Sequence, residues 1–329
     1  MIYLVWVAVF FCIAGALALL FDEHMEYCLA PALCGSILLL YLFGLFGLLK
    51  PGIAAVALCG AVSAGYCLVR CVHGRTLFLR QWLTPAMLLA LVGVAYIAWV
   101  QRGRLVMGND EFSHWAVTVK MMTHLDALSI TQPDRMHFPD YPPATALLEY
   151  LFVRLTPNFT EGYLYRALNL LQLSLLLPYL GRFNLRRFGL ACAGMGALFL
   201  LPLAFYGEFY TDLCVDGVLA LLFAWTLFGW FGRRKRDKFA ALWVTLGCAT
   251  LTLTKSSGFA LALIALVLIL WDSMRQRMGV LGHDRSLAHN LASQRLWLIP
   301  LGGCLAAQFS WNLLCRIHLG SGGSSHTLA

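Results

Sequence analysis

The sequence predicts an all-α integral membrane protein, a polytopic helix bundle of about ten spans. Hydrophobic residues make up 60% of the 329 residues and charged residues only 12%, with a mean hydropathy of +0.74. A soluble domain is about 45–50% apolar and about 25% charged. The apolar residues also gather into runs close to the roughly 20 residues that a helix needs to cross a bilayer. We therefore expect lipid to be the main solvent of this chain.

Ten apolar segments account for the predicted spans. The segments 239–254 and 258–271 are short, and we expect a hairpin of abbreviated or tilted helices around the turn 254–258. The ten segments are 2–21, 27–49, 52–72, 84–101, 163–181, 188–206, 213–231, 239–254, 258–271 and 296–314.

Basic residues predict the side of the membrane that each connection faces, because cytoplasmic loops are enriched in lysine and arginine. The strongest cluster, 233–238, is assigned to the cytoplasm. Alternation then puts the N-terminus, the segment 102–162, the turn 207–212 and Lys255 outside. The net charge of +8 follows this pattern, so it does not indicate nucleic-acid binding. Arg70, Arg75, Arg80, Arg182, Arg186, Arg187, Arg275, Arg277, Arg285 and Arg295 agree with this orientation, whereas Arg102 and Arg104 do not.

The segment 102–162 is the only long hydrophilic stretch. Apolar residues interleaved through 115–122 and 144–155 predict helices that lie in the membrane interface. We divide the chain into N-terminal transmembrane helices (1–83), a membrane core (84–271), and 272–329 with a basic cytoplasmic loop, the last span and a Gly/Ser-rich tail at 320–325. The eleven cysteines lie mostly in apolar runs, so we expect buried apolar side chains rather than disulfides.

Acidic residues are concentrated on the predicted outer face, which is the main functional clue. Ten of the 16 acidic residues lie between Gly108 and Gly217, and distributed solubility would not gather them there. They are Asp110, Glu111, Asp126, Asp134, Asp140, Glu149, Glu161, Glu208, Asp212 and Asp216.

Asp110 and Glu111 open the outer segment soon after a span. His114 follows Asp110 by four residues, so on an α-helix the two side chains share a face. A partly desolvated carboxylate beside an imidazole can accept a proton from a hydroxyl. The alternative is a helix cap at Asn109 or Asp110, a role that is compatible with catalysis.

Glu208, Asp212 and Asp216 recur every four residues, which predicts one acidic stripe on a helix entering the span 213–231. Asp216 then lies about one turn inside apolar sequence. An ionisable group at that depth normally faces a cavity or a partner. The alternative is a structural ion pair with a basic residue on another helix.

Lys255 is the only basic residue in the apolar stretch 239–271, and small hydroxylic residues flank it. A cation at a helix turn suits a phosphate or pyrophosphate, and the alternative is a snorkelling lysine. The stiff strip 138–143 carries Asp140 and Tyr141, whose ring can stack on a sugar or a lipid; the alternative is a rigid corner. His114, His124 and His137 have no metal-ligand spacing, so we predict no cofactor, with a divalent metal as an option.

These motifs resemble the GT-C superfamily of membrane glycosyltransferases, which use polyprenyl-phosphate-linked sugars. The block 110–115, Asp-Glu-Phe-Ser-His-Trp, looks like the Asp-Glu-x-His-Phe block of protein O-mannosyltransferases with one inserted residue. The element 141–143 resembles the Pro-Pro element of those enzymes and of aminoarabinose transferases. The stretch 208–212 resembles the acidic second outer loop, and 254–258 the Lys-x-x-Gly turn. The resemblance covers about 84–271 and suggests a truncated or minimal member.

The resemblance implies transfer of a sugar from a polyprenyl-phosphate donor to a hydroxyl of an acceptor glycan, lipid or protein on the extracytoplasmic face. Asp110 is expected to be the general base, and Glu111 to bind sugar hydroxyls or orient the acceptor. Lys255 is expected to neutralise the lipid phosphate together with Arg135 or Arg166. Glu208 and Asp212 would shape the acceptor side or hold the optional metal. The expected location is a multi-pass membrane protein, in the plasma membrane of a bacterial host.

Two other functions fit the same composition. In a membrane transporter, Asp216 and Lys255 would be intramembrane ligands for an ion or a substrate. In a non-catalytic membrane subunit, neither the acidic loop nor the lysine would act on a substrate.

Overall fold

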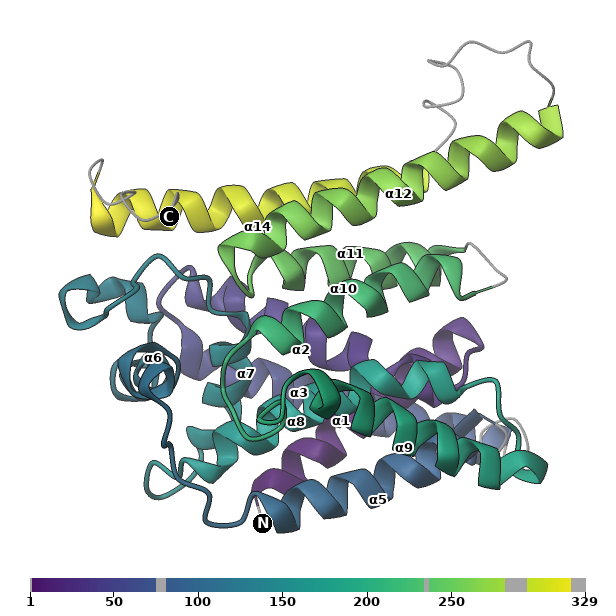
Figure 1. The fold of residues 1–329 in the computed structure, drawn as a ribbon, viewed down its shortest axis with the longest axis horizontal. Coiled ribbons are helices and arrows are strands. Elements are labelled where there is room, and N and C mark those ends of the chain that lie inside the picture. Colours follow the sequence, from purple (N-terminus) through teal and green to yellow (C-terminus); the bar gives the residue numbers. More distant parts are fainter. Residues whose placement is uncertain (1, 75–80, 234–236, 282–294, 321–329) are drawn as a thin grey trace. The chain divides into compact units, whose positions relative to one another are not determined.

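Helices form the regular structure, as the sequence predicts. The computed structural model describes residues 2–74, 81–233, 237–281 and 295–320 and has no strand among them (Figure 1). Within these described ranges, six helices are long and apolar enough to cross a membrane, as expected of a helical membrane protein. These are Ile2–Phe21, Met25–Gly44, Leu49–His73, Leu185–Phe205, Ser256–Arg275 and Trp297–Leu319.

Packing divides the chain into two compact units. The first consists of Met1–Pro139 and Pro143–Val218, and the second of Asp140–Pro142 and Leu219–Ala329. The predicted division at 83 and 271 followed sequence motifs rather than packing, and it stays a prediction. Arg75, Arg80, residues 234–236, Arg285 and nearly all of the tail 320–325 lie outside the described residues.

Each of the ten predicted apolar segments contains a helix, although some of these helices are short. In chain order the helices of four or more residues and the π-helical turn are α1 (Ile2–Phe21), α2 (Leu29–Gly44), α3 (Leu49–His73), α5 (Pro85–Val100), η2 (Glu111–Trp115), α6 (Ala116–Leu125), α7 (Ala144–Val153), α8 (Gly162–Leu176), η5 (Leu177–Leu180), α9 (Phe188–Phe205), α10 (Asp216–Phe231), α11 (Lys238–Thr252), α12 (Ser256–Leu281) and α14 (Arg295–Leu319). The short 3-10 turns are η1 (Met25–Tyr27), η3 (Ser129–Thr131), η4 (Pro133–Arg135) and η6 (Leu185–Arg187). The number of ten spans stays a prediction.

Of the two helices predicted to be abbreviated or tilted, α11 is short, with 15 residues, but α12 is not abbreviated. Helix α12 has 26 residues and continues well beyond the apolar run. Backbone hydrogen bonding does not require apolar side chains, so the helix extends through the polar residues that follow Trp271.

Helices α7 and α8 form the centre of the first unit. Every residue of α7 is buried, including the carboxyl-bearing Glu149, because α8, α2 and α6 pack around it. An interfacial helix keeps one polar face in water or headgroups. The segment 102–162 contains helices in both predicted stretches, but α7 is a core helix rather than an interfacial one.

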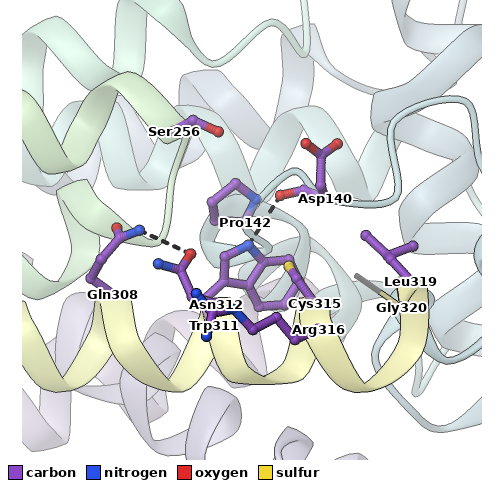
Figure 2. Close-up of a pocket in the computed structure, with 10 residues that line it drawn as sticks. All are labelled: Asp140, Pro142, Ser256, Gln308, Trp311, Asn312, Cys315, Arg316, Leu319 and Gly320. Carbon is purple, nitrogen blue, oxygen red and sulfur yellow. Dashed lines mark hydrogen bonds between the residues drawn. The ribbon is translucent and has the colours of Figure 1, made fainter. Parts of the chain in front are cut away.

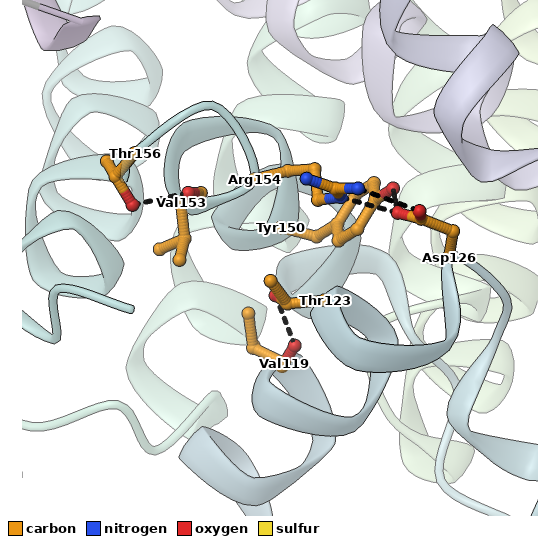
Figure 3. A network of polar contacts seen from close by, with 7 residues as sticks. All are labelled: Val119, Thr123, Asp126, Tyr150, Val153, Arg154 and Thr156. Atoms are coloured by element: carbon orange, nitrogen blue, oxygen red, sulfur yellow. Dashed lines mark hydrogen bonds and ion pairs between the residues drawn. The ribbon is translucent and has the colours of Figure 1, made fainter. Parts of the chain in front are cut away.

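An ion pair joins the end of α6 to α7 (Figure 3). Asp126 ends α6 in the left-handed region, at φ 52°, which its short polar side chain tolerates better than most. Its carboxylate accepts hydrogen bonds from Arg154 Nε at 2.5 Å and Nη2 at 2.8 Å, and from the Tyr150 hydroxyl at 2.8 Å. The Arg154 guanidinium lowers the pKa of the Asp126 carboxyl group, which favours its charged form.

The beginning of α5 marks one end of the first unit. The Thr84 hydroxyl donates to Glu26 Oε2 at 2.8 Å, and Gln81 Nε2 donates to Asp22 Oδ1 at 2.9 Å. These bonds bring the connection after α1 beside the connection before α5. Both connections were predicted to face the cytoplasm.

The other end of α5 lies among the predicted outer loops. Gln101, directly after α5, donates to Asn169 Oδ1 at 2.8 Å and to the Tyr210 carbonyl at 3.0 Å. The 16 residues of α5 separate this end from Thr84 by about 24 Å, at 1.5 Å per residue. The two sets of connections thus lie at opposite ends of the first unit, in agreement with the predicted alternation.

In the second unit, α11 and α12 form the predicted hairpin and α14 packs beside them. A Cβ atom at Gly258 would lie 1.9 Å from the Leu251 carbonyl oxygen, so only glycine allows the first turn of α12 this close to α11. The Gly258 N–H also bonds to the Lys255 carbonyl at 2.8 Å. The glycine of the Lys-x-x-Gly turn therefore has a packing role.

We predict that Gly258→Ala lowers the stability of the protein by about 1–3 kcal/mol, the usual cost of overpacking, because the obstructing atom belongs to the backbone. Gly302→Ala in α14 is the matched control. Its added Cβ would meet nothing within 4 Å, so it should stabilise the helix by up to about 1 kcal/mol. Thermal unfolding in detergent micelles measures both, and equal effects of the two variants would contradict the packing role.

Candidate functional site

Glu111 connects three separate parts of the first unit. Its side chain is 3% exposed and accepts four hydrogen bonds. Oε2 accepts from the backbone N–H groups of Met107 (3.0 Å) and Gly108 (2.8 Å). Oε1 accepts from the Tyr165 hydroxyl of α8 (2.8 Å) and from the Leu213 N–H (2.9 Å). The first outer loop, α8 and the segment before α10 therefore meet at one carboxylate.

This bonding occupies both oxygens of the Glu111 carboxylate. A carboxylate has about four acceptor sites on its two oxygens, and protein donors occupy four here. No acceptor site is left for a sugar hydroxyl. Glu111 therefore holds three segments in place, and its predicted role of binding sugar hydroxyls or orienting the acceptor stays a prediction.

The predicted acidic stripe of Glu208, Asp212 and Asp216 is wrong, because residues 206–215 are not helical. Helix α9 ends at Phe205, and a turn carries Glu208 and Asp212 before α10 begins at Asp216. Asp216 is therefore the exposed first residue of a helix, and not an acid one turn inside a span.

Three buried amide side chains hold this turn. Gln172 Nε2 donates to the Phe209 carbonyl at 3.3 Å, and Asn169 Nδ2 donates to the Tyr210 carbonyl at 3.2 Å. Gln101 Nε2 adds a second bond to the Tyr210 carbonyl. These side chains bond backbone carbonyls that a continuing helix would pair internally, so the turn replaces the helix that the spacing suggested.

The two loops predicted to face outside line an open cavity of about 540 Å³. Asp110, Glu208 and Asp212 bring three carboxylates to it, as the clustering of acids predicted. Asp212 accepts from the Tyr206 hydroxyl and from the Cys214 N–H at 2.9 Å. The full lining is Arg104, Met107, Gly108, Asn109, Asp110, Glu111, Tyr206, Glu208, Thr211, Asp212 and Cys214.

Cys214 does not supply a nucleophile to this cavity. Burial, followed by the neighbouring Asp212 carboxylate, raises the pKa of its thiol to about 12. Asp110 and Asp216 add further negative charge around the thiol. The charged groups of the cavity are therefore its carboxylates and any cation beside them.

Arg104 is that cation. It lines the cavity, its Nη2 donates to the Thr211 carbonyl at 2.8 Å, and its guanidinium lies 5.4 Å from the centre of the Tyr165 ring. The sequence showed it only as an exception to the charge pattern. The sequence feature that could have identified Arg104 is a basic residue on the predicted outer side, a few residues before the acid pair Asp110 and Glu111.

The two arginines predicted to assist Lys255 are not in the cavity. Arg166 donates to the Ala98 carbonyl at 2.9 Å and lies over the rings of Tyr3 and Tyr163, so it joins α8 to α5 and α1. Arg135 lies exposed in η4. Neither lines the cavity that contains Asp110.

His114 lies in the protein interior rather than beside Asp110 on a shared face. Residues 111–115 form a π-helical turn in which the Ala116 N–H bonds to the Glu111 carbonyl, so the α-helical spacing does not apply. The His114 ring packs edge-on against Trp115 and Phe138, with centroids 4.6 and 5.7 Å away. Burial, with His137 nearby, lowers its pKa to about 4. The imidazole is neutral at physiological pH and does not line the cavity.

The second unit brings the Pro-Pro strip and the lysine turn together (Figure 2). A cavity of about 230 Å³ has Asp140 and Pro142 on one side, Ser256 at the start of α12, and Trp311 of α14. The Trp311 indole donates to the Asp140 carbonyl at 3.0 Å, which fixes the strip that contains Tyr141. Lys255 directly precedes Ser256, and its approach to Asp110 stays a prediction. The α14 residues Gln308, Trp311, Asn312 and Arg316 were not anticipated from sequence.

Glu149 is a second buried carboxyl behind the cavity. It is 2% exposed, and burial, followed by the charge of Glu111, raises its pKa to about 8. A protonated Glu149 avoids placing two negative charges close together in the core.

Neither metal-ligand geometry nor similarity to known proteins assigns a function to this cavity. Within the ranges that the structure describes, no three His, Cys, Asp or Glu side chains are arranged to hold a metal ion, and the optional metal stays a prediction. Comparisons with protein-family models, with curated proteins and with solved structures find no match for this chain.

We predict that Glu149 makes stability fall as pH rises. Its folded pKa of about 8 exceeds the usual 4.5, so its contribution is complete below pH 4.5 and is lost as pH rises to about 8. The slope is about 1.4 kcal/mol per pH unit for one group. Glu149→Gln should flatten the dependence of thermal unfolding on pH between about 5 and 8, whereas the exposed Asp134→Asn should not. Parallel curves for wild type and Glu149→Gln would refute this assignment.

Proposed function

We propose that this protein is a GT-C-type membrane glycosyltransferase, which transfers a sugar from a polyprenyl-phosphate donor to a hydroxyl acceptor. One observation carries the proposal. The loops around Asp110 and around Glu208 and Asp212, about 100 residues apart in sequence, enclose one cavity with a fixed arginine beside the carboxylates. A base next to a cation is the pair of charges that phosphate displacement by a hydroxyl requires.

The cavity is proposed to open on the extracytoplasmic side. It lies at the end of the first unit where acids gather, and the opposite end carries Arg182, Arg186 and Arg187. Lysine and arginine mark cytoplasmic loops, so this separation of charge supports the orientation. A polyprenyl donor in the outer leaflet then reaches the cavity from the lipid.

In the proposed reaction, Asp110 accepts the proton of the acceptor hydroxyl as its oxygen attacks the anomeric carbon. The bond between that carbon and the phosphate oxygen breaks, and the electron pair leaves with the phosphate. The polyprenyl phosphate gains negative charge, which Arg104 is placed to offset. Lys255 is proposed as a second cation for the same phosphate. Arg104 thus takes the place of Arg135 and Arg166 in the proposal.

The remaining acids have supporting roles in this proposal. Glu208 and Asp212 line the acceptor side, where Asp212 is fixed by Tyr206 and the Cys214 N–H. Glu111 holds the loops in position. The alternative of a transporter is weakened because Asp216, its proposed intramembrane ligand, is an exposed helix-start residue.

We predict that Asp110→Asn lowers sugar transfer from a polyprenyl-phosphate donor by about 10²–10⁴-fold, the usual worth of a general base. Its thermal unfolding midpoint should stay that of the wild type, since Asp110 is exposed. Wild-type transfer by Asp110→Asn would rule out the base assignment.

We predict that Glu111→Gln, unlike Asp110→Asn, lowers both stability and activity. This variant distinguishes a residue that positions the loops from one that contacts the substrate. An amide would turn an N–H group toward donors that now bond Glu111, leaving at least one of them unpaired. Loss of a buried hydrogen bond to a charged group costs about 1.5–3 kcal/mol, so both unfolding midpoint and activity should fall. Loss of activity with an unchanged unfolding midpoint would contradict the positioning role.

A further inference from the structure

A second polar cavity lies at the other end of the first unit, about 24 Å from the acidic cavity along α5. Its volume is about 660 Å³. Its polar lining comes from the connections after α1, before α5 and after α8. The polar side chains are His24, Glu26, Thr84, Arg182, Asn184 and Arg186.

This cavity has two basic side chains and one acidic side chain at different depths. Arg182 and Arg186 are exposed at its rim, and neither forms an ion pair among the residues that the structure describes. Glu26, in contrast, is 1% exposed, and its carboxyl group accepts the Thr84 hydroxyl at 2.8 Å. Burial raises the pKa of this carboxyl group, and an ammonium group beside it would favour its charged form. A ligand in the cavity meets arginine first and a buried carboxylate behind it.

His24 provides an unsatisfied polar atom in the same cavity. Its Nδ1 is buried and has no hydrogen-bond partner in the described part of the chain. A buried polar atom without a partner costs about 1–3 kcal/mol, so a ligand that bonds it is favoured. His24 also lies close enough to Glu26 to interact with it electrostatically.

We propose that this cavity binds the headgroup of an aminophospholipid, with its phosphate between Arg182 and Arg186 and its ammonium group on Glu26. A simple anion would meet the buried carboxylate, and a simple cation would meet two arginines. A zwitterion with phosphate and ammonium a few bonds apart satisfies both. The cavity lies where spanning helices end in basic connections, which is the depth of lipid headgroups. The proposal is independent of sugar transfer.

The test compares lipids on the wild-type full-length protein in detergent micelles, with bound lipid counted by native mass spectrometry. Phosphatidylethanolamine is expected to bind about tenfold more tightly than phosphatidylcholine, the worth of one hydrogen bond to a charged group. Phosphatidylcholine has the same phosphate but no N–H donor. Phosphatidylglycerol, an anion without an amine, should also bind more weakly.

Variants separate the two halves of the site. Replacing Arg182 and Arg186 by alanine should weaken phosphatidylethanolamine binding by about tenfold or more. Arg187→Ala is the matched control, since Arg187 is exposed beside them but does not line the cavity. Glu26→Gln should remove the preference for phosphatidylethanolamine over phosphatidylcholine. If Glu26→Gln does not fold, the comparison of phosphatidylethanolamine with phosphatidylcholine on the wild type still tests whether the ammonium group binds Glu26.

Three results would overturn the proposal. Equal binding of phosphatidylethanolamine and phosphatidylcholine to the wild type would exclude a bond from the ammonium group. Tighter binding of phosphatidylglycerol than of phosphatidylethanolamine would show that the cavity binds an anion and does not recognise the ammonium group. Equal effects of the arginine pair and of Arg187→Ala would indicate adsorption anywhere on the basic end.

Discussion

The Glu111 carboxylate is the interaction on which the rest of the site depends. It is a buried charge, and burying a charge is costly unless donors replace the lost water. Its donors come from the loop before it, from Tyr165 and from Leu213, far apart in sequence. The cost of burial is offset only when all of these meet. Folding around the Glu111 side chain therefore fixes the positions of the loops that line the acidic cavity. Asp110 lies exposed next to the buried Glu111.

Charge is separated along the first unit, and helix length sets the distance. Helix α5 has Thr84 and the arginine-rich connections at its beginning, and the acidic cavity beyond Gln101 at its end. Both cavities contain arginine and carboxylate, but their arrangement differs. In one, several carboxylates surround Arg104, an arrangement suited to removing a proton and offsetting a phosphate. In the other, arginines lie outside a single buried carboxylate, an arrangement suited to holding a zwitterion.

Composition and hydropathy were sufficient for the helical membrane class, because burial in lipid depends on local apolar runs. The gathering of acids from two loops was also predictable from their shared side. The conformation of the second loop was not, since Asn169 and Gln101, remote in sequence, bond its carbonyls in place of a helix. Arg104 and the burial of α7 were missed for the same reason. Such contacts are made through space, and spacing along one chain does not encode them.

The central claim is that the loops carrying Asp110 and Glu208 share one cavity on the exterior face. Labelling with a membrane-impermeant maleimide, read by mass spectrometry at a cysteine introduced at Asp110, Glu208 or Asn184, tests this most directly. We expect intact cells to be labelled at the first two positions, and Asn184→Cys to be labelled only after permeabilisation. Labelling of Asp110→Cys and Asn184→Cys from the same side would contradict it.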